Sequence, residues 1–180
     1  GDPSGCAGRG RPAFVEHLVD VADARSVRPV DADGGEGGAE PPYCCQSDLN
    51  IAHRVQRLTH DIDYINVHGT STPLGDIAET NAILELFKEH SYNLNISSTK
   101  SMTGHLLGAA GVVESIACIM SVKNNIIPPT INHFERDDKI DPKLNLTFNE
   151  SQEKNVDFAI SNTFGFGGHN ASTLFKKFTE

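Results

Sequence analysis

The chain has 180 residues, of which 38% are hydrophobic, enough for one domain with a packed core. Its 24 acidic residues outnumber the 15 basic ones, and the net charge of −9 argues against nucleic acid and anionic membranes as partners, since both attract clustered Lys and Arg. No apolar run approaches the roughly 20 residues of a membrane span, and no secretory signal is visible at the N-terminus, so we expect a cytoplasmic protein.

Residues 1–57 differ in composition from the rest of the chain. Up to Arg57 the basic residues are all arginine. After it they are lysine, with Arg136 as the one exception. The acidic, glycine-rich run at residues 31–42 has the composition of a flexible linker. We therefore predict a low-complexity extension at residues 1–57, disordered or not native to the domain, and a folded domain at residues 58–180.

The four cysteines give no sign of a metal site. Cys6 lies in the extension, Cys44 and Cys45 are adjacent, and no His or Cys pair has the spacing of zinc ligands. Cys118 lies in an apolar helical pattern, which predicts a buried thiol. We expect the cysteines to be reduced and the protein to bind no metal.

The first structured stretch is predicted to be a strand followed by a helix. Residues 63–67 are a short apolar run that ends at His68. In residues 76–90 apolar side chains recur at helical spacing. Asp76 is a candidate N-cap, and Glu79 three residues later completes the order of a capping box.

The same order of strand, corner and helix then repeats. Residues 94–98 are predicted to form a strand, followed by Lys100 and His105, and residues 106–124 to form a helix. Small residues at positions 108–111 would let this helix approach another backbone closely. Its core-facing positions are expected to be Val113, Ile116, Ala117, Ile119 and Met120.

The last part of the domain is predicted to be all strand. Strands are expected at residues 144–148, 156–161 and 171–178, with a glycine-rich turn at residues 165–168 between the last two. The overall order β-α-β-α-β-β predicts an α/β fold with a mixed sheet.

Two corners that bear imidazoles are the candidate site. His68 on one side, and Lys100 with His105 on the other, follow consecutive strands, and α/β sheets bind ligands at the carboxyl ends of their strands. Two imidazoles and an ammonium group suit an acidic or carbonyl substrate. A pair between Lys100 and Glu114 would keep the lysine charged and the neighbouring imidazole neutral; the alternative is a solvated ion pair.

Polar and glycine-rich segments flank these corners. The hydroxyls of Thr70, Ser71 and Thr72 either satisfy backbone groups in the turn or hydrogen-bond an amide-rich ligand arm. The glycines around Phe166 lack the register of a nucleotide loop and no helical pattern follows them. A turn whose N–H groups approach a ligand fits that segment better.

Three segments, taken in order, point to a family. They are residues 67–76, residues 98–105 with the Gly-Ala-Ala-Gly at 108–111, and the Ser-Asn-Thr-Phe-Gly-Phe-Gly-Gly at 161–168. Together they resemble the C-terminal half of the elongating β-ketoacyl-acyl-carrier-protein synthases I and II, in the thiolase-like superfamily. The resemblance implies that residues 58–180 are a β-ketoacyl synthase C-terminal domain, the second half of a thiolase-like fold, with a mixed sheet covered by helices.

The resemblance also implies roles for the candidate residues. His68 and His105 would be the active-site histidines, which hydrogen-bond the malonyl thioester carbonyl, promote decarboxylation and stabilise the resulting enolate. Lys100 would orient and tune His105, with Glu114 as its partner. Thr70 and Thr72 would contact the phosphopantetheine arm of acyl carrier protein.

The glycine-rich loop would act as a gate. Phe166, flanked by Gly165 and Gly167, would be the gating aromatic, and its backbone N–H would help to form the oxyanion hole. The resemblance implies no bound cofactor beyond the phosphopantetheine that carries the substrate. The partners it implies are acyl carrier protein, the N-terminal half of the synthase and, in the complete enzyme, a second copy in a homodimer.

None of the cysteines matches the family's nucleophile, which lies in the N-terminal half. We therefore expect part of a synthase II-like condensing enzyme of fatty acid biosynthesis, inactive alone, with an apolar helix face that the other half would cover. One alternative is a non-catalytic partner subunit or pseudoenzyme that binds acyl carrier protein. Another is a thiolase proper, whose pattern would place a cysteine near the glycine-rich loop that here has Phe166.

Overall fold

The computed structural model describes residues 59–165 and 169–178. The predicted extension at residues 1–57 lies outside this part, as do Phe166 and Gly167 of the predicted gate. The helices are α2 (Gly75–Phe87), α3 (Lys100–Thr103) and α4 (Ala110–Asn124), with 3₁₀ turns at Thr59–Asp61, Lys88–Asn93 and Leu107–Ala109. The strands are β1 (Tyr64–Asn66), β2 (Asn95–Ser97), β3 (Ile126–Ile127), β4 (Gln152–Glu153), β5 (Phe158–Gly165) and β6 (His169–Lys176).

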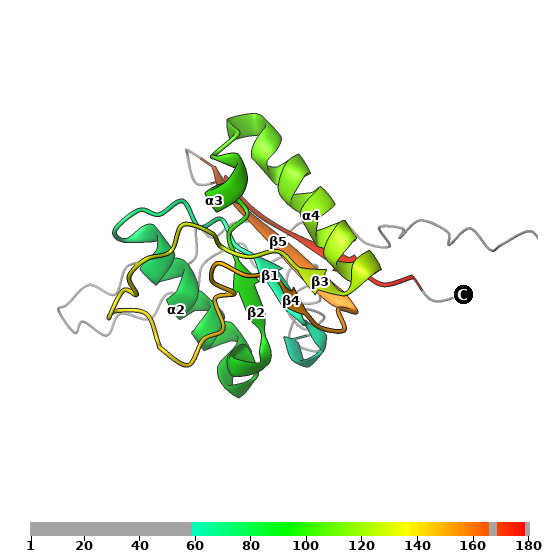
Figure 1. Cartoon of the computed structure of the whole chain (residues 1–180), viewed down its shortest axis with the longest axis horizontal. Coiled ribbons are helices and arrows are strands. Elements are labelled where there is room, and N and C mark those ends of the chain that lie inside the picture. The colour runs from blue at the N-terminus through cyan, green and yellow to red at the C-terminus, as the bar shows by residue number, and fades with distance from the viewer. Residues whose placement is uncertain (1–58, 166–168, 179–180) are drawn as a thin grey trace, which may run out of the picture.

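Four of these strands form one mixed sheet in the order β2-β1-β5-β6 (Figure 1). β1 pairs in parallel with β2 and with β5, whereas β6 runs antiparallel to β5. Asn66 at the end of β1 lies beside Ser97 at the end of β2. The predicted mixed sheet is confirmed, and the corners that follow β1 and β2 leave it at the same end.

A helix covers each face of this sheet. Successive strand residues point to opposite faces, so Tyr64 packs in the core shared with α4 and Ile65 in the core shared with α2. Phe87 of α2 closes one core, and Cys118 of α4 closes the other. The predicted buried thiol at Cys118 is confirmed.

The helix predicted at residues 106–124 is interrupted at its start and turns a different face to the sheet. Leu107 has a positive φ of 52° and begins the short 3₁₀ turn Leu107–Ala109 that precedes α4. Gly111 lets α4 approach β5, since a Cβ there would lie 3.2 Å from Oγ1 of Thr163. Cys118 and the polar Glu114 are buried.

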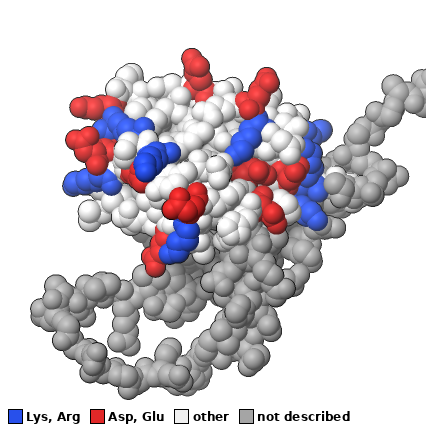
Figure 2. Space-filling view, turned by 90° about the horizontal axis from the view of Figure 1, so that it is seen from below, with Lys and Arg blue, Asp and Glu red and all other residues white. Residues whose placement is uncertain are grey.

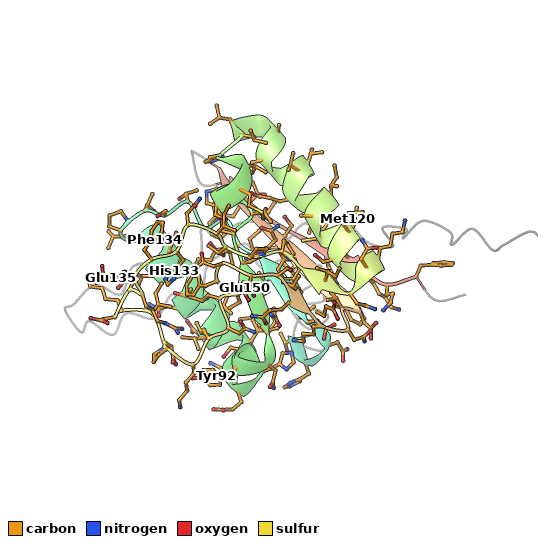
Figure 3. The ribbon with its side chains drawn as sticks, in the orientation of Figure 1. Tyr92, Met120, His133, Phe134, Glu135 and Glu150 are labelled. Atoms are coloured by element: carbon orange, nitrogen blue, oxygen red, sulfur yellow. The ribbon has the colours of Figure 1, made fainter. Side chains whose placement is uncertain are left out.

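The outward face of α4 is apolar (Figure 3). Its large exposed residues are Val112, Ile116 and Met120, with 63, 55 and 49% of their surface accessible. The prediction that Ile116 and Met120 face the core is therefore wrong, because buried Glu114 takes part of the helix face that apolar residues were expected to fill. α4 thus carries an exposed apolar stripe of the kind that another protein surface covers.

The strand predicted at residues 144–148 is wrong. This segment forms only isolated bridges, from Asn145 to Asn95 and from Phe148 to Thr130. Thr147 takes a positive φ of 46°, which is incompatible with an extended strand. The segment therefore crosses the sheet edge as an irregular loop.

Among the residues that the structure describes, the helical stretch Leu107–Asn124 is long and apolar enough to cross a membrane by length and composition alone. The sequence was expected to hold no apolar run near the length of a membrane span, and this segment contradicts that expectation. Only 28% of it is buried, yet Glu114 in its middle is buried and paired with Lys100. A helix that forms a buried ion pair with another part of the protein is packed on a protein core.

Candidate active site

The first corner follows β1 and carries His68. The main-chain N–H groups of His68 and Gly69 donate to the two carboxylate oxygens of Glu79, each at 3.0 Å. Asn162 of β5 donates to the same carboxylate at 3.1 Å. Glu79 is 6% exposed, and its burial raises the pKa of the carboxyl even though these hydrogen bonds act to lower it. A buried carboxyl group of α2 thus holds the main chain at His68.

The capping box predicted at the start of α2 is wrong. The N-cap residue is Leu74, whose side chain makes no capping hydrogen bond. Asp76 accepts the N–H of Ser71 at 3.1 Å, and Glu79 reaches back to the corner at His68. Both carboxyl groups hold the loop before the helix instead of the helix's own first turn.

Gly69 has no room for a side chain. It lies in the left-handed region (φ +40°), and a Cβ there would lie 2.7 Å from Cβ of Ser98 and 2.9 Å from Cγ2 of Val67. Gly69→Ala is expected to lower the free energy of unfolding by about 3 kcal/mol, because overlap adds to backbone strain. Urea denaturation measures this loss.

Gly104→Ala is the matched control for that substitution. Gly104 also has a positive φ (+72°), but an added Cβ would meet no atom within 4 Å. Backbone strain alone is expected to cost about 1–2 kcal/mol there. If the two variants lose the same free energy of unfolding, the overlap of the added Cβ at Gly69 contributes nothing to the loss.

The second corner follows β2 and carries Lys100 and His105. Lys100 begins the short helix α3, which Gly104 ends, and His105 lies exposed beyond it. The ammonium group of Lys100 forms an ion pair with Glu114 of α4, and both side chains are buried. The pair is therefore not solvated, and the positive charge of Lys100 lies close enough to His68 to lower the pKa of its imidazole.

The rings of His68 and His105 lie next to each other, with centroids 5.4 Å apart and planes at 86°. Nδ1 of His68 accepts the main-chain N–H of Phe164 at 3.3 Å, and Nδ1 of His105 accepts that of Leu107 at 3.1 Å. A neutral imidazole bonded in this way carries its proton on Nε2. Each ring therefore offers one Nε2–H donor, and two adjacent donors suit an oxygen on which negative charge develops.

The surroundings of His68 keep its ring neutral. Burial, the positive charge of Lys100 and that of a protonated His105 lower the pKa of His68 from 6.5 to about 4. Since the folded pKa lies below the ordinary one, the unfolded chain takes up this proton first as pH falls. The contribution of His68 to stability is thus lost between pH 6.5 and about 4.

An NMR titration of the imidazole resonances checks this shift. His68 is expected to be neutral at pH 6 and to titrate near its lowered pKa of about 4. Lys100→Met should move the midpoint upward, because it removes one of the two neighbouring charges that disfavour the imidazolium. A midpoint near 6.5 in the unmodified chain would contradict the geometry described for this corner.

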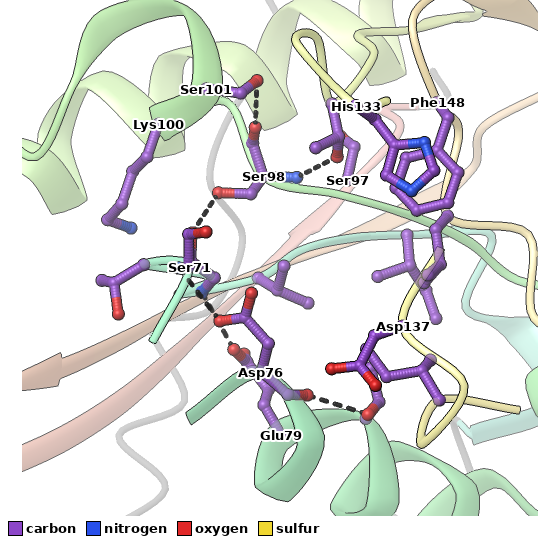
Figure 4. A pocket seen from close by; sticks show the side chains of 18 of the residues that line it. Ser71, Asp76, Glu79, Ser97, Ser98, Lys100, Ser101, His133, Asp137 and Phe148 are labelled. Atoms are coloured by element: carbon purple, nitrogen blue, oxygen red, sulfur yellow. Dashed lines mark hydrogen bonds between the residues drawn. The ribbon is translucent and has the colours of Figure 1, made fainter. Parts of the chain in front are cut away.

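A pocket of about 680 Å³ lies beside the two corners (Figure 4). Its lining includes Lys100, His105, Thr70 and Thr72, and residues 130–133 and 135–137, whereas His68 is not among the lining residues. Thr72 Oγ1 accepts the N–H of Gly75 at 3.2 Å. That hydroxyl serves the turn, as one reading of the sequence expected, and its O–H can still donate to a ligand.

An aromatic side chain flanks His68. The ring centroid of Phe164 lies 5.2 Å from that of the imidazole, and Phe164 is exposed near the end of β5. Gly165, the next residue, is the last of β5. The predicted gate residues Phe166 and Gly167 lie outside the described residues.

Sequence reasoning missed three residues that support the corners: Glu79 at the main chain of His68, Asn162 beside it, and Ser98. The hydroxyl of Ser98 donates to the carbonyl of Gly69 at 2.7 Å. A signal for Glu79 was present, since it shares the inward face of α2 with apolar Ile83. An acidic side chain on such a face needs buried partners.

The described residues supply neither a reactive thiol nor a metal cluster. Cys118, the one free cysteine among them, is fully buried, and burial raises the pKa of its thiol, opposite to what a nucleophilic thiolate needs. Within residues 59–165 and 169–178, no group of three or more His, Cys, Asp or Glu side chains could hold a metal ion.

Acidic and basic side chains are interspersed on the face of the molecule that Figure 2 shows.

Comparison with known proteins points to one family of enzymes. Residues 46–134 match the β-ketoacyl synthase C-terminal domain. The chain is 44% identical over 147 residues to 3-oxoacyl-[acyl-carrier-protein] synthase 2 of Staphylococcus aureus (strain COL), a match that covers 82% of this chain and 34% of the relative. It is 49% identical over 117 residues to the protein of the same name from Synechocystis, covering 65% and 28%.

A solved structure shows the same fold. The type II PKS ketosynthase of the AntDE:AntF complex, solved with its acyl-carrier protein and bound to the hexaketide, matches with a TM-score of 0.64 and 31% identity. That match covers 67% of this chain and 29% of the other. The chain spans about a third of the length of the curated relatives (34% and 28%). By its sequence, its mixed sheet and its domain match, the chain belongs to the β-ketoacyl synthase family, of which it carries the C-terminal domain.

Proposed function

We propose that this domain supplies the decarboxylating part of a 3-oxoacyl-[acyl-carrier-protein] synthase site, which extends acyl chains in fatty acid biosynthesis with malonyl-ACP. The observation that carries the proposal is the pair of adjacent Nε2–H donors on His68 and His105. The names of the relatives, both 3-oxoacyl-[acyl-carrier-protein] synthase 2, support it.

In the proposed reaction, the carbonyl oxygen of the malonyl thioester accepts both Nε2–H bonds. The bond between the α-carbon and the carboxylate breaks, CO2 leaves, and the electron pair becomes an enolate whose oxygen the two donors stabilise. The α-carbon then attacks the carbonyl carbon of an acyl group held as a cysteine thioester. A C–C bond forms, and the thiolate leaves and takes a proton from solvent. That cysteine belongs to the remaining part of the synthase.

Lys100 supports this step through its charge. The buried ammonium, held by Glu114, helps to lower the pKa of His68 and thus keeps that ring a neutral N–H donor. The same positive charge favours negative charge on a nearby oxygen, so it stabilises the enolate more than the thioester. Lys100 in this role tunes both imidazoles without contacting the substrate.

The substrate would arrive on the phosphopantetheine of acyl carrier protein, with no separate bound cofactor. Its arm would lie along the pocket past Thr70 and Thr72, and Phe166 with Gly165 and Gly167 would close over it. The solved ketosynthase that was captured with its acyl-carrier protein supports this partner. The apolar stripe of α4 would pack against the N-terminal half of the synthase, in a cytoplasmic homodimer.

A second candidate is a non-catalytic partner subunit that binds acyl carrier protein. The observation in its favour is the buried Cys118, which leaves the described residues without a reactive thiol. The donor pair argues against it, because a subunit that only binds does not need two adjacent imidazoles that each carry an Nε2–H.

The test pairs the full chain with the N-terminal half of the Staphylococcus aureus relative. Labelled CO2 released from malonyl-ACP measures decarboxylation, and the β-ketoacyl product measures condensation. We expect both activities only when the two proteins are combined. A complex that forms on gel filtration but releases no more CO2 than the N-terminal half alone would favour the non-catalytic subunit.

A further inference from the structure

The two histidine corners stay in contact beyond the ends of their strands. The pairing of β1 with β2 ends at Asn66 and Ser97, and one more main-chain bond follows, from the N–H of Val67 to the carbonyl of Ser97 at 3.0 Å. The two chain segments then separate, one to carry His68 and the other to form the second corner. Beyond Val67 and Ser97, contacts between the two segments determine how far apart their functional groups lie.

Ser98 joins them. Its hydroxyl donates to the carbonyl oxygen of Gly69 at 2.7 Å. Its own N–H donates to Oγ1 of Thr130 at 2.9 Å, and its carbonyl accepts the hydroxyl of Ser101 at 2.8 Å (Figure 4). Ser98 is 7% exposed. Because its main chain is held on both sides and the residue is almost fully buried, its hydroxyl is aimed at the first corner by the fold itself.

Gly69, the residue after His68, is therefore held at both its N–H and its carbonyl. Glu79 accepts the N–H of Gly69, and Ser98 donates to its carbonyl. The segments also touch, since a Cβ on Gly69 would lie 2.9 Å from Oγ of Ser98. The corner can move neither toward β2 nor away from it without loss of one of these contacts.

We propose that Ser98 is a positioning residue that sets the distance between the imidazole of His68 and the groups of the second corner, Lys100 and His105. This inference rests on the function proposed above for the two histidines. Two donors can serve one oxygen only while their rings stay close, and the effect of the ammonium charge on the imidazole falls with distance. A hydroxyl with a purely structural role would change stability and leave the titration of His68 as it is.

The test is an NMR titration of His68 in the full chain and in Ser98→Ala. Loss of the hydroxyl should let the corners separate, and the His68 midpoint is expected to rise from about 4 by about one unit. Ser121→Ala is the matched control: Ser121 is a buried serine of α4 whose hydroxyl donates to the carbonyl of Ala117 at 2.9 Å, and it should leave the midpoint unchanged. An unchanged midpoint in folded Ser98→Ala, or an equal rise in Ser121→Ala, would overturn the proposal.

Two further variants complete the experiment. Ser98→Thr keeps the hydroxyl and should restore the original midpoint. If Ser98→Ala does not fold, Ser98→Cys decides, because its thiol is a weaker donor: an intermediate midpoint supports the proposal and the original midpoint overturns it. The readout does not depend on turnover. If the proposed function is wrong, the assembled synthase releases no CO2. If this inference is wrong, the titration midpoint of His68 is the same in Ser98→Ala as in the unmodified chain.

Discussion

Replacement of His68 or His105 by alanine is expected to lower the decarboxylation of malonyl-ACP by about 10²–10³-fold in the assembled synthase. Each ring presents one Nε2–H, and the two rings lie next to each other with centroids 5.4 Å apart. Because the bonds strengthen as the enolate forms, kcat should fall by more than KM rises. CO2 release at saturating malonyl-ACP measures the effect, and the double variant should lose less than the product of the two single losses.

Two control variants make this result specific. Glutamine at either position keeps an N–H donor, so it should retain more activity than alanine does. His60 is an exposed histidine outside the donor pair, and His60→Ala should leave CO2 release unchanged. An alanine variant of His68 or His105 that keeps more than about a tenth of the activity would show that the donor pair is not the main source of stabilisation.

The second large effect is expected at Glu79. Its two oxygens accept N–H groups from His68, Gly69 and Asn162. Glutamine offers one acceptor oxygen and one NH2 group, so Glu79→Gln leaves at least one buried N–H facing another donor. Such a mismatch is expected to lower the free energy of unfolding by about 2 kcal/mol. Urea denaturation with a two-state fit measures it.

Glu85→Gln is the control on the same helix. Glu85 is exposed, and its replacement should change the free energy of unfolding by less than about 0.5 kcal/mol. If both variants lose the same small amount, the carboxyl group of Glu79 does not hold the corner, and the order of the His68 main chain must come from the strand ladder alone.

Local patterns were sufficient for the sheet and for the place of the corners. Short apolar runs that end in Gly- and Thr-rich segments predicted β1 and β2, and the alternation with helical periodicity predicted the mixed sheet. His68 and His105 could be proposed as a pair because both follow these strands. What places their rings 5.4 Å apart is the parallel pairing of β1 with β2, which periodicity alone does not specify.

Long-range contacts explain where sequence reasoning failed. Glu79 has the spacing of a capping residue, but its side chain bonds the corner ten and eleven residues earlier. Ile116 and Met120 have the spacing of core residues, but they face outward because Glu114 takes the inward face of α4, where it pairs with Lys100. Thr147 fits a strand pattern, yet its positive φ ends any extended run. Each outcome depends on a partner or a backbone conformation that the local pattern does not show.

The central claim is that both Nε2–H groups bind one thioester carbonyl, and the carbonyl ¹³C chemical shift of a bound, non-hydrolysable malonyl-pantetheine analogue tests it most directly. In the assembled synthase the two bonds should polarise the carbonyl and move its resonance downfield. The shift should shrink in His68→Ala and in His105→Ala, and fall to the unbound value when both are replaced. A bound analogue with an unshifted carbonyl, or a shift that survives loss of both imidazoles, would contradict the account.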